Sequence, residues 1–506
     1  DDHRAHRLES GRIGERILAD RIPACFLRTE IVRSRWRHLR VTRRHEVERR
    51  LRMRKKVVQA FVRKCAPQRL QEIRLELAAR NPENKIDPTL DRIRAAAEIL
   101  GDPQLVYPVI HIAGTNGKTT TSRMIETLLR EFGLTTGLMT SPHLHDERER
   151  IRLNGEPVDV QRFIEAYEEI EPYLGLVDDR IGRLSYFEVL TLLGFAIFAD
   201  APVGVAVIEV GLGGELDASN IVEPVVTVIT PIGMDHQEYL GNELAGIAQA
   251  KAGILKPGAV PVLSRQSLEC AEVIANRCAE LGIPMLREGV EFGVVDRQIA
   301  VGGQLLTLHG IGGDYTDIML PLHGEHQASN AAVALTAVEA FFGATRQLDP
   351  DVVRSGFLNV TSPGRCEVVR RSPTVIVDAA HNPHGAQALA TTLADSFDFR
   401  RLVGVIAVLA EKDAHGVLEA LEPVLDEVVI TRNTSPRALE VDALRRIAVE
   451  VFGDGRVHVA ASLPAAAELA TSLVDTYLGE GGLGIVITGS VVTAAEGRAL
   501  YGKTSV

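Results

Sequence analysis

Short apolar runs alternate with longer segments of helical apolar spacing through residues 109–230. The runs have the length of buried strands, and the segments between them are long enough to form helices that cross back over a sheet. Repeated strand-then-helix units of this kind predict a parallel α/β sheet. The expected strands are 109–113, 136–141, 203–210 and 224–230, and the expected helices are 122–132, 160–173 and 187–199.

The second half of the chain starts differently and then repeats the strand-then-helix pattern. Residues 285–322 are β-rich, an alanine-rich helix is expected over 327–342, and residues 343–364 contain Gly, Pro and polar residues typical of a domain boundary. A second α/β series follows, which predicts a smaller Rossmann-like domain without a phosphate-loop lysine. Its expected strands are 374–377, 402–409, 427–431, 457–460 and 484–488.

A Gly-bounded turn follows the first of these strands and carries a lysine and three hydroxyl residues. Thr115, Asn116, Gly117, Lys118 and Thr119 stand between that strand and the next helical segment. Loop and helix N–H groups, the helix dipole, the lysine charge and a hydroxyl for Mg²⁺ together form a cradle for nucleotide phosphates. The standard phosphate-loop motif begins with a glycine, and this chain has Ile112 at that position.

Length and motif order define the expected fold class. The chain has 506 residues, of which 45% are hydrophobic. A chain of this length is too long for a single hydrophobic core and is expected to fold into more than one domain. We predict an α/β protein with an N-terminal P-loop ATPase-like domain, mostly parallel in its sheet, and a smaller Rossmann-like C-terminal domain. The predicted units are an extension over 1–56, a central domain over 57–345 and a C-terminal domain over 346–506. In the central domain, Asp87-Pro88 is expected to start a helix.

Charge is distributed unevenly along the chain. The net charge is −11, but residues 1–56 carry about +10 and are rich in arginine. They lack the Gly and aromatic interleaving of an RNA binder, so we expect a poorly ordered or helical extension and no nucleic-acid partner.

The cysteines and the apolar segments indicate the cellular compartment in which the protein is expected. Five cysteines without a Cys-x-x-Cys pair favour a reduced protein. We see no membrane-spanning segment and no signal peptide, and we expect a cytoplasmic monomer.

Polar residues stand at the ends of several predicted strands of the first sheet. The Lys118 loop, Ser141, Glu209 and His236 all occupy such positions, and ligands of open α/β sheets bind beyond the carboxyl ends of the strands. Oxygen ligands at this edge, completed by nucleotide phosphates, suit Mg²⁺. The alternatives are a salt bridge for Glu209 and a hydrogen-bonded loop histidine for His236.

Two further segments carry candidate chemistry. Asp378 to Pro383 places an acid, an imidazole and an amide beyond the first strand of the second domain, which indicates a site. Arg365 lies in the interdomain segment, where it either reaches a nucleotide or is exposed. By pattern alone, Lys251 is a surface lysine near a helix end.

These motifs, in this order, resemble the folylpolyglutamate synthase/dihydrofolate synthase family, relatives of the Mur ligases. The resemblance extends from about residue 60 to the C-terminus. It rests on Gly114-Thr115-Asn116-Gly117-Lys118, Thr140-Ser141-Pro142-His143-Leu144, Phe187-Glu188, the segment from Glu209 to Asn220, Asp235-His236, Lys251-Ala252-Gly253-Ile254, His326-Gln327 with Asn330, Pro363-Gly364-Arg365 and the segment from Asp378 to Pro383.

The resemblance implies an ATP-dependent, ADP-forming amide ligase. A folate or dihydropteroate carboxylate would attack the γ-phosphate of ATP to give an acyl phosphate, and the amine of L-glutamate would then displace phosphate. Tetrahydrofolate or dihydropteroate, L-glutamate and ATP are the expected partners. Mg²⁺, two ions by this resemblance, and a monovalent cation are the expected inorganic cofactors.

The resemblance also implies the role of each candidate residue. The implied catalytic residues are Lys118, Lys251, His381 and Asp378, with His381 at the glutamate and phosphate end. The nucleotide would contact Thr115, Asn116, Gly117, Lys118, Thr119, Asn330, Arg365 and Asp378. The metal ligands would be Ser141, Glu209, His236, Thr119 and a carbamylated Lys251. The pterin pocket would be lined by Ser185, Tyr186, Phe187, Asp217 and Ala218.

Three positions depart from the family pattern. Thr119-Thr120 follow the loop lysine where Gly-Ser or Gly-Thr is usual, Glu215 replaces an arginine near the pterin pocket, and Ala250 replaces an acid before Lys251. The last two bear on substrate affinity. Two alternatives therefore stay open: a Mur-type ligase for another amino acid, and a catalytically weak nucleotide-binding protein.

Overall fold

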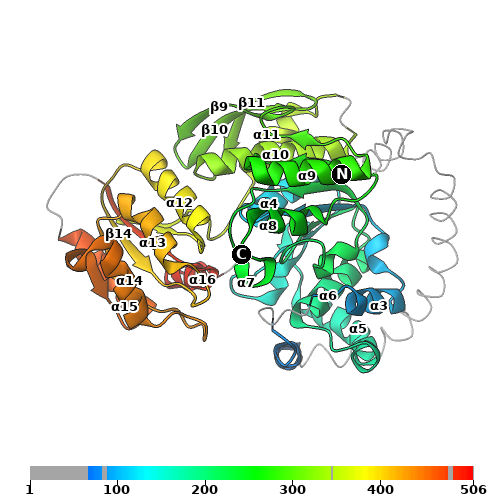
Figure 1. Ribbon diagram of the computed structural model, residues 1–506, viewed down its shortest axis with the longest axis horizontal. Helices are drawn as coiled ribbons and strands as arrows, with labels where there is room; N and C mark the ends of the chain where they lie inside the picture. Colours follow the sequence, from blue (N-terminus) through cyan, green and yellow to red (C-terminus); the bar gives the residue numbers. More distant parts are fainter. Residues whose placement is uncertain (1–65, 83–87, 344–345, 477–481, 505–506) are drawn as a thin grey trace, which may run out of the picture.

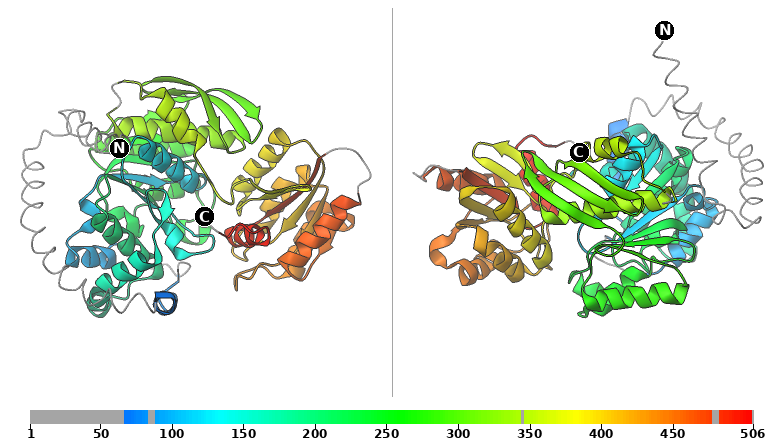
Figure 2. Two further views of the ribbon diagram at one scale, coloured as in Figure 1. Left: turned by 180° about the vertical axis from the view of Figure 1, so that it is seen from behind. Right: turned by 90° about the horizontal axis from the view of Figure 1, so that it is seen from above.

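The computed structural model describes residues 66–82, 88–343, 346–476 and 482–504. The predicted extension over residues 1–56 lies outside these ranges. Two bodies are visible in Figure 1, a larger one with strands β1 to β11 and a smaller one with strands β12 to β17. Figure 2 shows the same two bodies from behind and from above.

The larger body is built on an eight-stranded sheet with the order β4-β3-β2-β5-β1-β6-β7-β8. β2, β5, β1, β6, β7 and β8 run parallel, while β3 and β4 form an antiparallel edge. This confirms the mostly parallel sheet. The strands are β1 (Val109–Ala113), β2 (Thr136–Met139), β3 (Ile151–Leu153), β4 (Glu156–Pro157), β5 (Val205–Glu209), β6 (Pro224–Ile229), β7 (Val260–Leu263) and β8 (Leu286–Arg287).

Helices cover both faces of this sheet. Because successive side chains of a strand point to opposite faces, β1 contributes to the core on each side. Val109 belongs to a core with α3, α5 and α6, and Ile110 to a core with α4 and α10. Residues 66–78 are helical, and the labelled helices of this body are α3 (Asp91–Ile99), α4 (Lys118–Glu131), α5 (Val160–Arg180), α6 (Tyr186–Asp200), α7 (Gln237–Leu240), α8 (Leu244–Ala252), α9 (Leu268–Leu281), α10 (Glu325–Phe341) and α11 (Pro350–Leu358).

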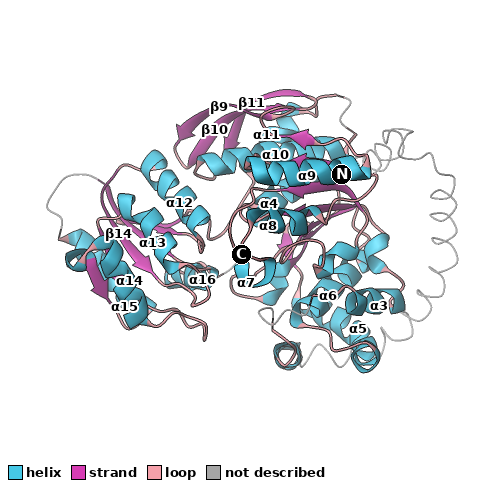
Figure 3. Ribbon diagram, viewed as in Figure 1, coloured by secondary structure: helices cyan, strands magenta, loops and turns pink. Residues whose placement is uncertain are grey.

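The β-rich segment forms a separate antiparallel sheet with the order β11-β10-β9. Its strands are β9 (Gly293–Ala300), β10 (Gly303–Gly310) and β11 (Gly313–Leu320). Leu308 and Tyr315 of this sheet are fully buried in the same core as α10. The alanine-rich helix therefore joins the small sheet to the large one, as the arrangement at the top of Figure 3 shows.

The smaller body contains a six-stranded sheet with the order β12-β13-β17-β14-β15-β16, parallel except for the edge strand β12. Its strands are β12 (Glu367–Arg371), β13 (Thr374–Val377), β14 (Phe399–Ile406), β15 (Glu427–Ile430), β16 (Val457–Val459) and β17 (Gly482–Thr488). Its helices are α12 (Pro383–Ser396), α13 (Ala414–Leu421), α14 (Val441–Phe452), α15 (Leu463–Asp475) and α16 (Val491–Leu500).

Three local expectations are wrong. The helix expected at Asp87-Pro88 begins at Asp91, whose N–H donates to the Thr89 hydroxyl, and Asp87 lies outside the described residues. The helix expected from Ser122 begins at Lys118. The segment placed at the domain boundary contains α11, which buries Val353 and Phe357 in the core of the larger body.

Candidate active site

The phosphate loop occupies the turn between β1 and α4 and needs both of its glycines. Gly114 has a φ of 150°, and a Cβ there would lie 1.8 Å from the Thr230 hydroxyl oxygen. Gly117 has a φ of 88°, precedes the first residue of α4 and abuts the Asn330 side chain, 2.7 Å from where a Cβ would stand. The left-handed backbone at Gly117 favours glycine, and it turns the start of α4 toward the loop.

Two lysine amines meet at one carbonyl of this loop, those of the partly buried Lys118 and the buried Lys251. Lys118 Nζ donates to the carbonyl oxygens of Gly114 and Thr115, at 3.1 and 3.2 Å, and Lys251 Nζ donates to Gly114 at 2.8 Å. Burial lowers the pKa of Lys118, although the charges of Glu209 and Asp235 act against it. Burial, and then the charge of Lys118, lower the pKa of Lys251 to about 7.

The expectation of a surface lysine at position 251 is wrong. Lys251 is only 5% exposed, because the loop at Gly214 packs directly on the end of α8. A Cβ at Gly214 would lie 2.7 Å from the Ala250 carbonyl oxygen and 3.0 Å from the Lys251 Cα. The two segments are far apart in sequence, so the helix pattern alone gave no sign of this contact.

Glu209, at the end of β5, presents an unsatisfied oxygen to the site. Its Oε1 accepts from the Thr119 hydroxyl at 2.9 Å, its carboxylate also accepts from the Ser141 N–H, and its Oε2 is buried without a partner among the described residues. Burial raises the pKa of Glu209 to about 7, against the charges of Lys118 and Arg365. A divalent cation would satisfy this oxygen and stabilise the charged carboxylate.

His236 stands apart from that group. The structure brings Thr119, Ser141 and Glu209 together, whereas His236 lies beside Asp235, with 3.8 Å between Nε2 and Oδ2. The His236 side chain is 43% exposed; partial burial and the nearby charges of Lys412 and Lys118 lower its pKa, so the imidazole is neutral at pH 7 and able to bind a metal. The described residues include no cluster of three His, Cys, Asp or Glu side chains placed to hold a metal. Hydroxyls and ligand oxygens would have to complete the shell.

The Glu209→Gln substitution gives a prediction with an unusual sign. In the folded chain the pKa of Glu209 is about 7, against 4.5 ordinarily, so its contribution to stability is full below pH 4.5 and is lost as the pH rises through 7. We expect the glutamine variant to be more stable than the parent by up to about 3 kcal/mol at pH 8 and to lose Mg²⁺-dependent turnover.

The measurement is urea unfolding of both proteins in EDTA without nucleotide, between pH 4 and pH 8. The stability difference should shrink as the pH falls. A glutamine variant that is less stable than the parent at pH 8 would contradict the conclusion that the charged Glu209 carboxylate destabilises the metal-free protein.

The predicted nucleotide contacts divide between the two bodies. Asn330 is buried in α10, and its Nδ2 donates to Gln327 Oε1 at 3.0 Å while its Oδ1 faces Gly117. Asp378 is buried, and both of its oxygens accept backbone N–H groups at 2.7 Å, from Cys366 and Ala380. Burial raises the pKa of Asp378, with the charge of Arg365 acting against it. Asn330 therefore lies against the loop, while Asp378 fixes the backbone around Arg365.

Asp235 is the site residue that sequence reasoning missed, and it joins the two bodies. Its Oδ1 lies 2.5 Å from Lys412 Nζ, and its Oδ2 accepts from Asn382 Nδ2 at 3.0 Å and lies 3.4 Å from His381 Nε2. Burial raises its pKa, but the His381 hydrogen bond and the charges of His381, His236 and Lys412 outweigh it and hold the pKa well below the usual range. The sequence did offer one sign of its role, since Asp235 is an acid directly before His236 and follows a strand end.

A second set of contacts runs from the phosphate loop to the same part of the smaller body. Asn116 Nδ2 lies 2.9 Å from His384 Nδ1 and 3.3 Å from Asn382 Oδ1. The loop is thus held against the start of α12, and His381 is held two residues before that helix. We call Asp235, Lys412, Asn382 and Asn116 the interdomain polar cluster.

Removal of one charge from this cluster should uncouple the two bodies. We expect Lys412→Met to leave the Asp235 carboxylate buried without its cation, a change worth about 3–5 kcal/mol for a buried pair, and to reduce kcat by about 10- to 100-fold because His381 is no longer fixed. Lys412→Arg should retain most of the activity. Small-angle scattering and steady-state kinetics test this, with Lys503→Met as the exposed control. Unchanged scattering and kcat in the methionine variant would refute the role of the cluster.

Two of the residues predicted to line a pterin pocket, Ser185 and Asp217, accept hydrogen bonds from backbone N–H groups. The Ser185 hydroxyl caps α6 by accepting from the Glu188 N–H. The Asp217 carboxylate accepts from the N–H groups of Leu212 and Ser219, next to the buried Ala218. These roles order the backbone around the pocket.

The two aromatic residues are better placed for a flat ligand. Tyr186 carries the Arg150 guanidinium 5.5 Å above its ring centroid. Phe187 packs on Gly211, where a Cβ would lie 2.5 Å from the ring. Both rings are only partly buried, so part of their surface is open to a ligand.

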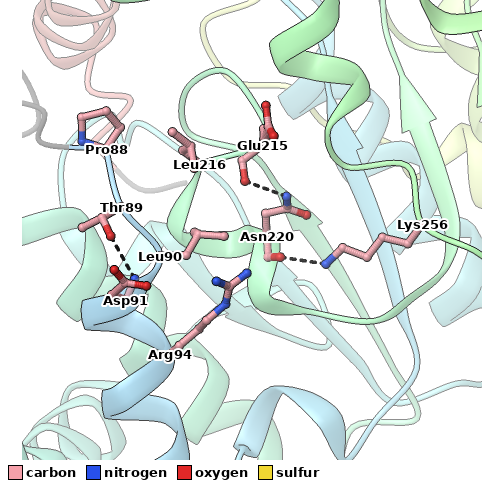
Figure 4. Close-up of a pocket in the computed structure, with 9 residues that line it drawn as sticks. All are labelled: Pro88, Thr89, Leu90, Asp91, Arg94, Glu215, Leu216, Asn220 and Lys256. Carbon is pink, nitrogen blue, oxygen red and sulfur yellow. Dashed lines mark hydrogen bonds between the residues drawn. The ribbon is translucent and has the colours of Figure 1, made fainter. Parts of the chain in front are cut away.

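Glu215 lies on the rim of a neighbouring pocket of about 370 Å³ (Figure 4). Arg94 and Lys256 line the same pocket, and Lys256 Nζ donates to the Asn220 carbonyl at 2.7 Å. The Asn220 side chain in turn donates to the Glu215 carbonyl. The Glu215 side chain, which replaces the family's arginine, is exposed, and its carboxylate points away from Arg94 and Lys256. Its effect on substrate affinity stays a prediction.

Membrane insertion finds no support in the described helices, none of which is long and apolar enough to cross a bilayer.

Family models match both bodies of the chain. The Mur ligase middle domain matches residues 183–338, and the glutamate ligase domain of Mur ligases matches residues 364–491. The dihydrofolate synthase/folylpolyglutamate synthase of Mycobacterium tuberculosis is 52% identical over 451 residues, which is 84% of this chain and 93% of that protein. The enzyme of the same name from Escherichia coli is 34% identical and covers 73% of this chain and 83% of its own length.

Solved structures agree with the sequence relatives. Folylpolyglutamate synthase of Mycobacterium tuberculosis complexed with ADP superposes with a TM-score of 0.84 at 51% identity, covering 87% of this chain and all of that one. An E. coli relative in complex with DHPP and ADP has a TM-score of 0.74 at 30% identity, covering 85% of this chain and 97% of its own. With its phosphate loop, its Mur ligase domains and relatives similar over most of its length, the chain belongs to the dihydrofolate synthase/folylpolyglutamate synthase family of the Mur ligases.

Proposed function

We propose that this chain is an ATP-dependent, ADP-forming ligase that adds L-glutamate to folates and also to dihydropteroate, through an acyl-phosphate intermediate. The observation that carries the proposal is the gathering of the phosphate loop, the unsatisfied Glu209 oxygen and two lysine amines at the strand ends of the larger body. That edge faces His381 and Asp378 of the smaller body, through contacts such as Asp235 to His381.

Each step requires charge control and alignment of two substrates. Lys118 and the N–H groups at the start of α4 would hold the transferring phosphate, and Arg365 would approach the nucleotide from the interdomain segment. The interdomain polar cluster would hold His381 at the end where the amine of glutamate attacks. Closure of the two bodies would keep water from the acyl phosphate.

Mg²⁺ fits the residues present, because Glu209 offers a buried oxygen without a partner and Thr119 and Ser141 lie against the same carboxylate. We propose two ions. Thr119, Ser141 and Glu209 would hold the first, which His236 would have to approach from its own loop, and carbamylated Lys251 would hold the second. A monovalent cation would bind at the same site. When bound, Mg²⁺ would neutralise the negative charge of the ATP phosphates.

The test is phosphate release from ATP by the purified chain with Mg²⁺. Release should require both an acceptor, tetrahydrofolate or dihydropteroate, and glutamate. Turnover with alanine or diaminopimelate in place of glutamate would favour a ligase for another amino acid. ATP binding without any acceptor-dependent turnover would refute the proposal.

A further inference from the structure

A small cavity lies between the two bodies, next to the phosphate loop. Its volume is about 40 Å³, and a cavity needs roughly 10–15 Å³ to hold one water. It therefore admits a group of a few heavy atoms and not a nucleotide. Its lining comes from α4, from the segment after β2, from the interdomain segment and from the smaller body: Thr119, Arg123, Thr140, Pro142, His143, Leu144, Glu149, Pro363, Arg365, Ala379 and Val491.

Arg123 is the unusual member of this lining. It lies in the second turn of α4, is only 9% exposed, and its guanidinium has neither a hydrogen bond nor an ion pair with any described residue. Burial, and then the charge of Arg152, lower its pKa to about 10, so it stays charged at pH 7. The guanidinium nitrogens are not enclosed by protein atoms and Arg123 lines the cavity, so an anionic ligand bound there would pair this charge.

Three acids act on the charge of Arg123: Glu126 and Glu149 are engaged with other groups, and Glu209 is the proposed metal ligand. Both oxygens of Glu149 accept backbone N–H groups, from Leu144 at 2.8 Å and from His145 and Asp146 at 3.0 Å. Glu126 accepts from the Thr136 hydroxyl and pairs with Arg130. Their charges raise the pKa of Arg123 only in part. The cavity thus keeps an unpaired guanidinium with Arg365 as a second cation on its wall.

We propose that Arg123 forms a carboxylate subsite that binds a carboxylate of a glutamyl group, either of free glutamate or of the glutamyl end of a folate. The inference rests on the proposed function. A planar guanidinium binds a carboxylate through two parallel hydrogen bonds. The nucleotide phosphates are served by the loop N–H groups and Lys118, whereas the cavity is too small for them. A carboxylate bound here lies beside Thr119 and Arg365, within the interdomain site where the glutamyl chain is extended.

The experiment is steady-state kinetics of Arg123→Met in the full chain. We expect a KM increase of about 10- to 100-fold for the substrate that carries the carboxylate, the range for loss of a bidentate charged contact, with the KM for ATP unchanged. Dihydropteroate has no glutamyl group, so with this acceptor a raised KM for glutamate identifies free glutamate. A raised KM for tetrahydrofolate, with an unchanged KM for glutamate, identifies the glutamyl end of the folate.

Two further variants keep the result decisive. Arg277→Met removes an exposed guanidinium from α9, outside the cavity lining, and should leave every KM unchanged. If the methionine variant does not fold, Arg123→Lys retains a charge without the planar fork, and a smaller rise of the same KM is expected. An unchanged KM for both glutamate and tetrahydrofolate, or an equal rise for ATP, would overturn the proposal. Absence of turnover in the parent protein would instead refute the proposed function.

Discussion

Lys118→Ala is expected to reduce phosphoryl transfer by about a thousandfold or more while the fold persists. The Lys118 amine donates to two loop carbonyls at 3.1 and 3.2 Å, so its charge is positioned before the phosphate arrives. Loss of one preorganised stabilising group of this kind reduces kcat by about 10²–10³-fold, and the lysine supplies a full charge in addition.

The measurement is ADP release under saturating ATP, folate and glutamate, with circular dichroism as the check on folding. Lys503→Ala, at an exposed position near the C-terminus, is the matched control and should be as active as the parent. Turnover of Lys118→Ala close to that of the control would mean that the phosphate site has been misplaced.

Lys251→Ala is expected to reduce turnover by about 10²–10³-fold and to abolish any response to bicarbonate. The neutral amine is the form that reacts with CO₂, and burial lowers the pKa of Lys251 to about 7, so about half is neutral at pH 7. Carbamylation converts this cation into a carboxylate-like group beside the cation of Lys118, which favours the modified form. Below pH 7 the amine takes up a proton, and the carbamylated fraction should fall.

The measurement is parent activity in CO₂-depleted buffer before and after addition of bicarbonate, at pH 6 and pH 8. Recovery should be complete at pH 8 and weaker at pH 6, and native mass spectrometry should detect one bound CO₂. Acetate should restore part of the activity of Lys251→Ala. Full activity of Lys251→Arg would exclude carbamylation, because arginine cannot form this group.

Local pattern predicted the elements that carry the site. The apolar runs located the cores of β1, β2, β5 and β6, and polar residues at or just beyond the strand ends, such as Glu209 and Ser141, were assigned to the sheet edge. That inference works because parallel strands place their carboxyl ends at the same edge. The edge strands β3, β4 and β12 were missed, since they are short or polar and lack the continuous apolar run of a buried strand.

Burial of charged groups could not be read from local pattern. Lys251 and Arg123 occupy positions that a helical pattern leaves to solvent, yet both are buried by segments distant in sequence. Asp235 stood in view beside His236, but its partner Lys412 lies 177 residues away. Contacts across such separations depend on how the two bodies meet, and nothing in a local window encodes that arrangement.

The sequence by itself determined the α/β class, the phosphate loop, the family and the set of residues at the strand ends, because each is expressed in local spacing or in short ordered motifs. The tertiary structure decided which of these residues touch. It joined Thr119 to Glu209, set Lys251 beside Lys118 at one carbonyl, and left Arg123 unpaired in an interdomain cavity. Desolvation and the pairing of charges arise only when distant segments pack together, and they set the protonation states on which the proposed chemistry depends.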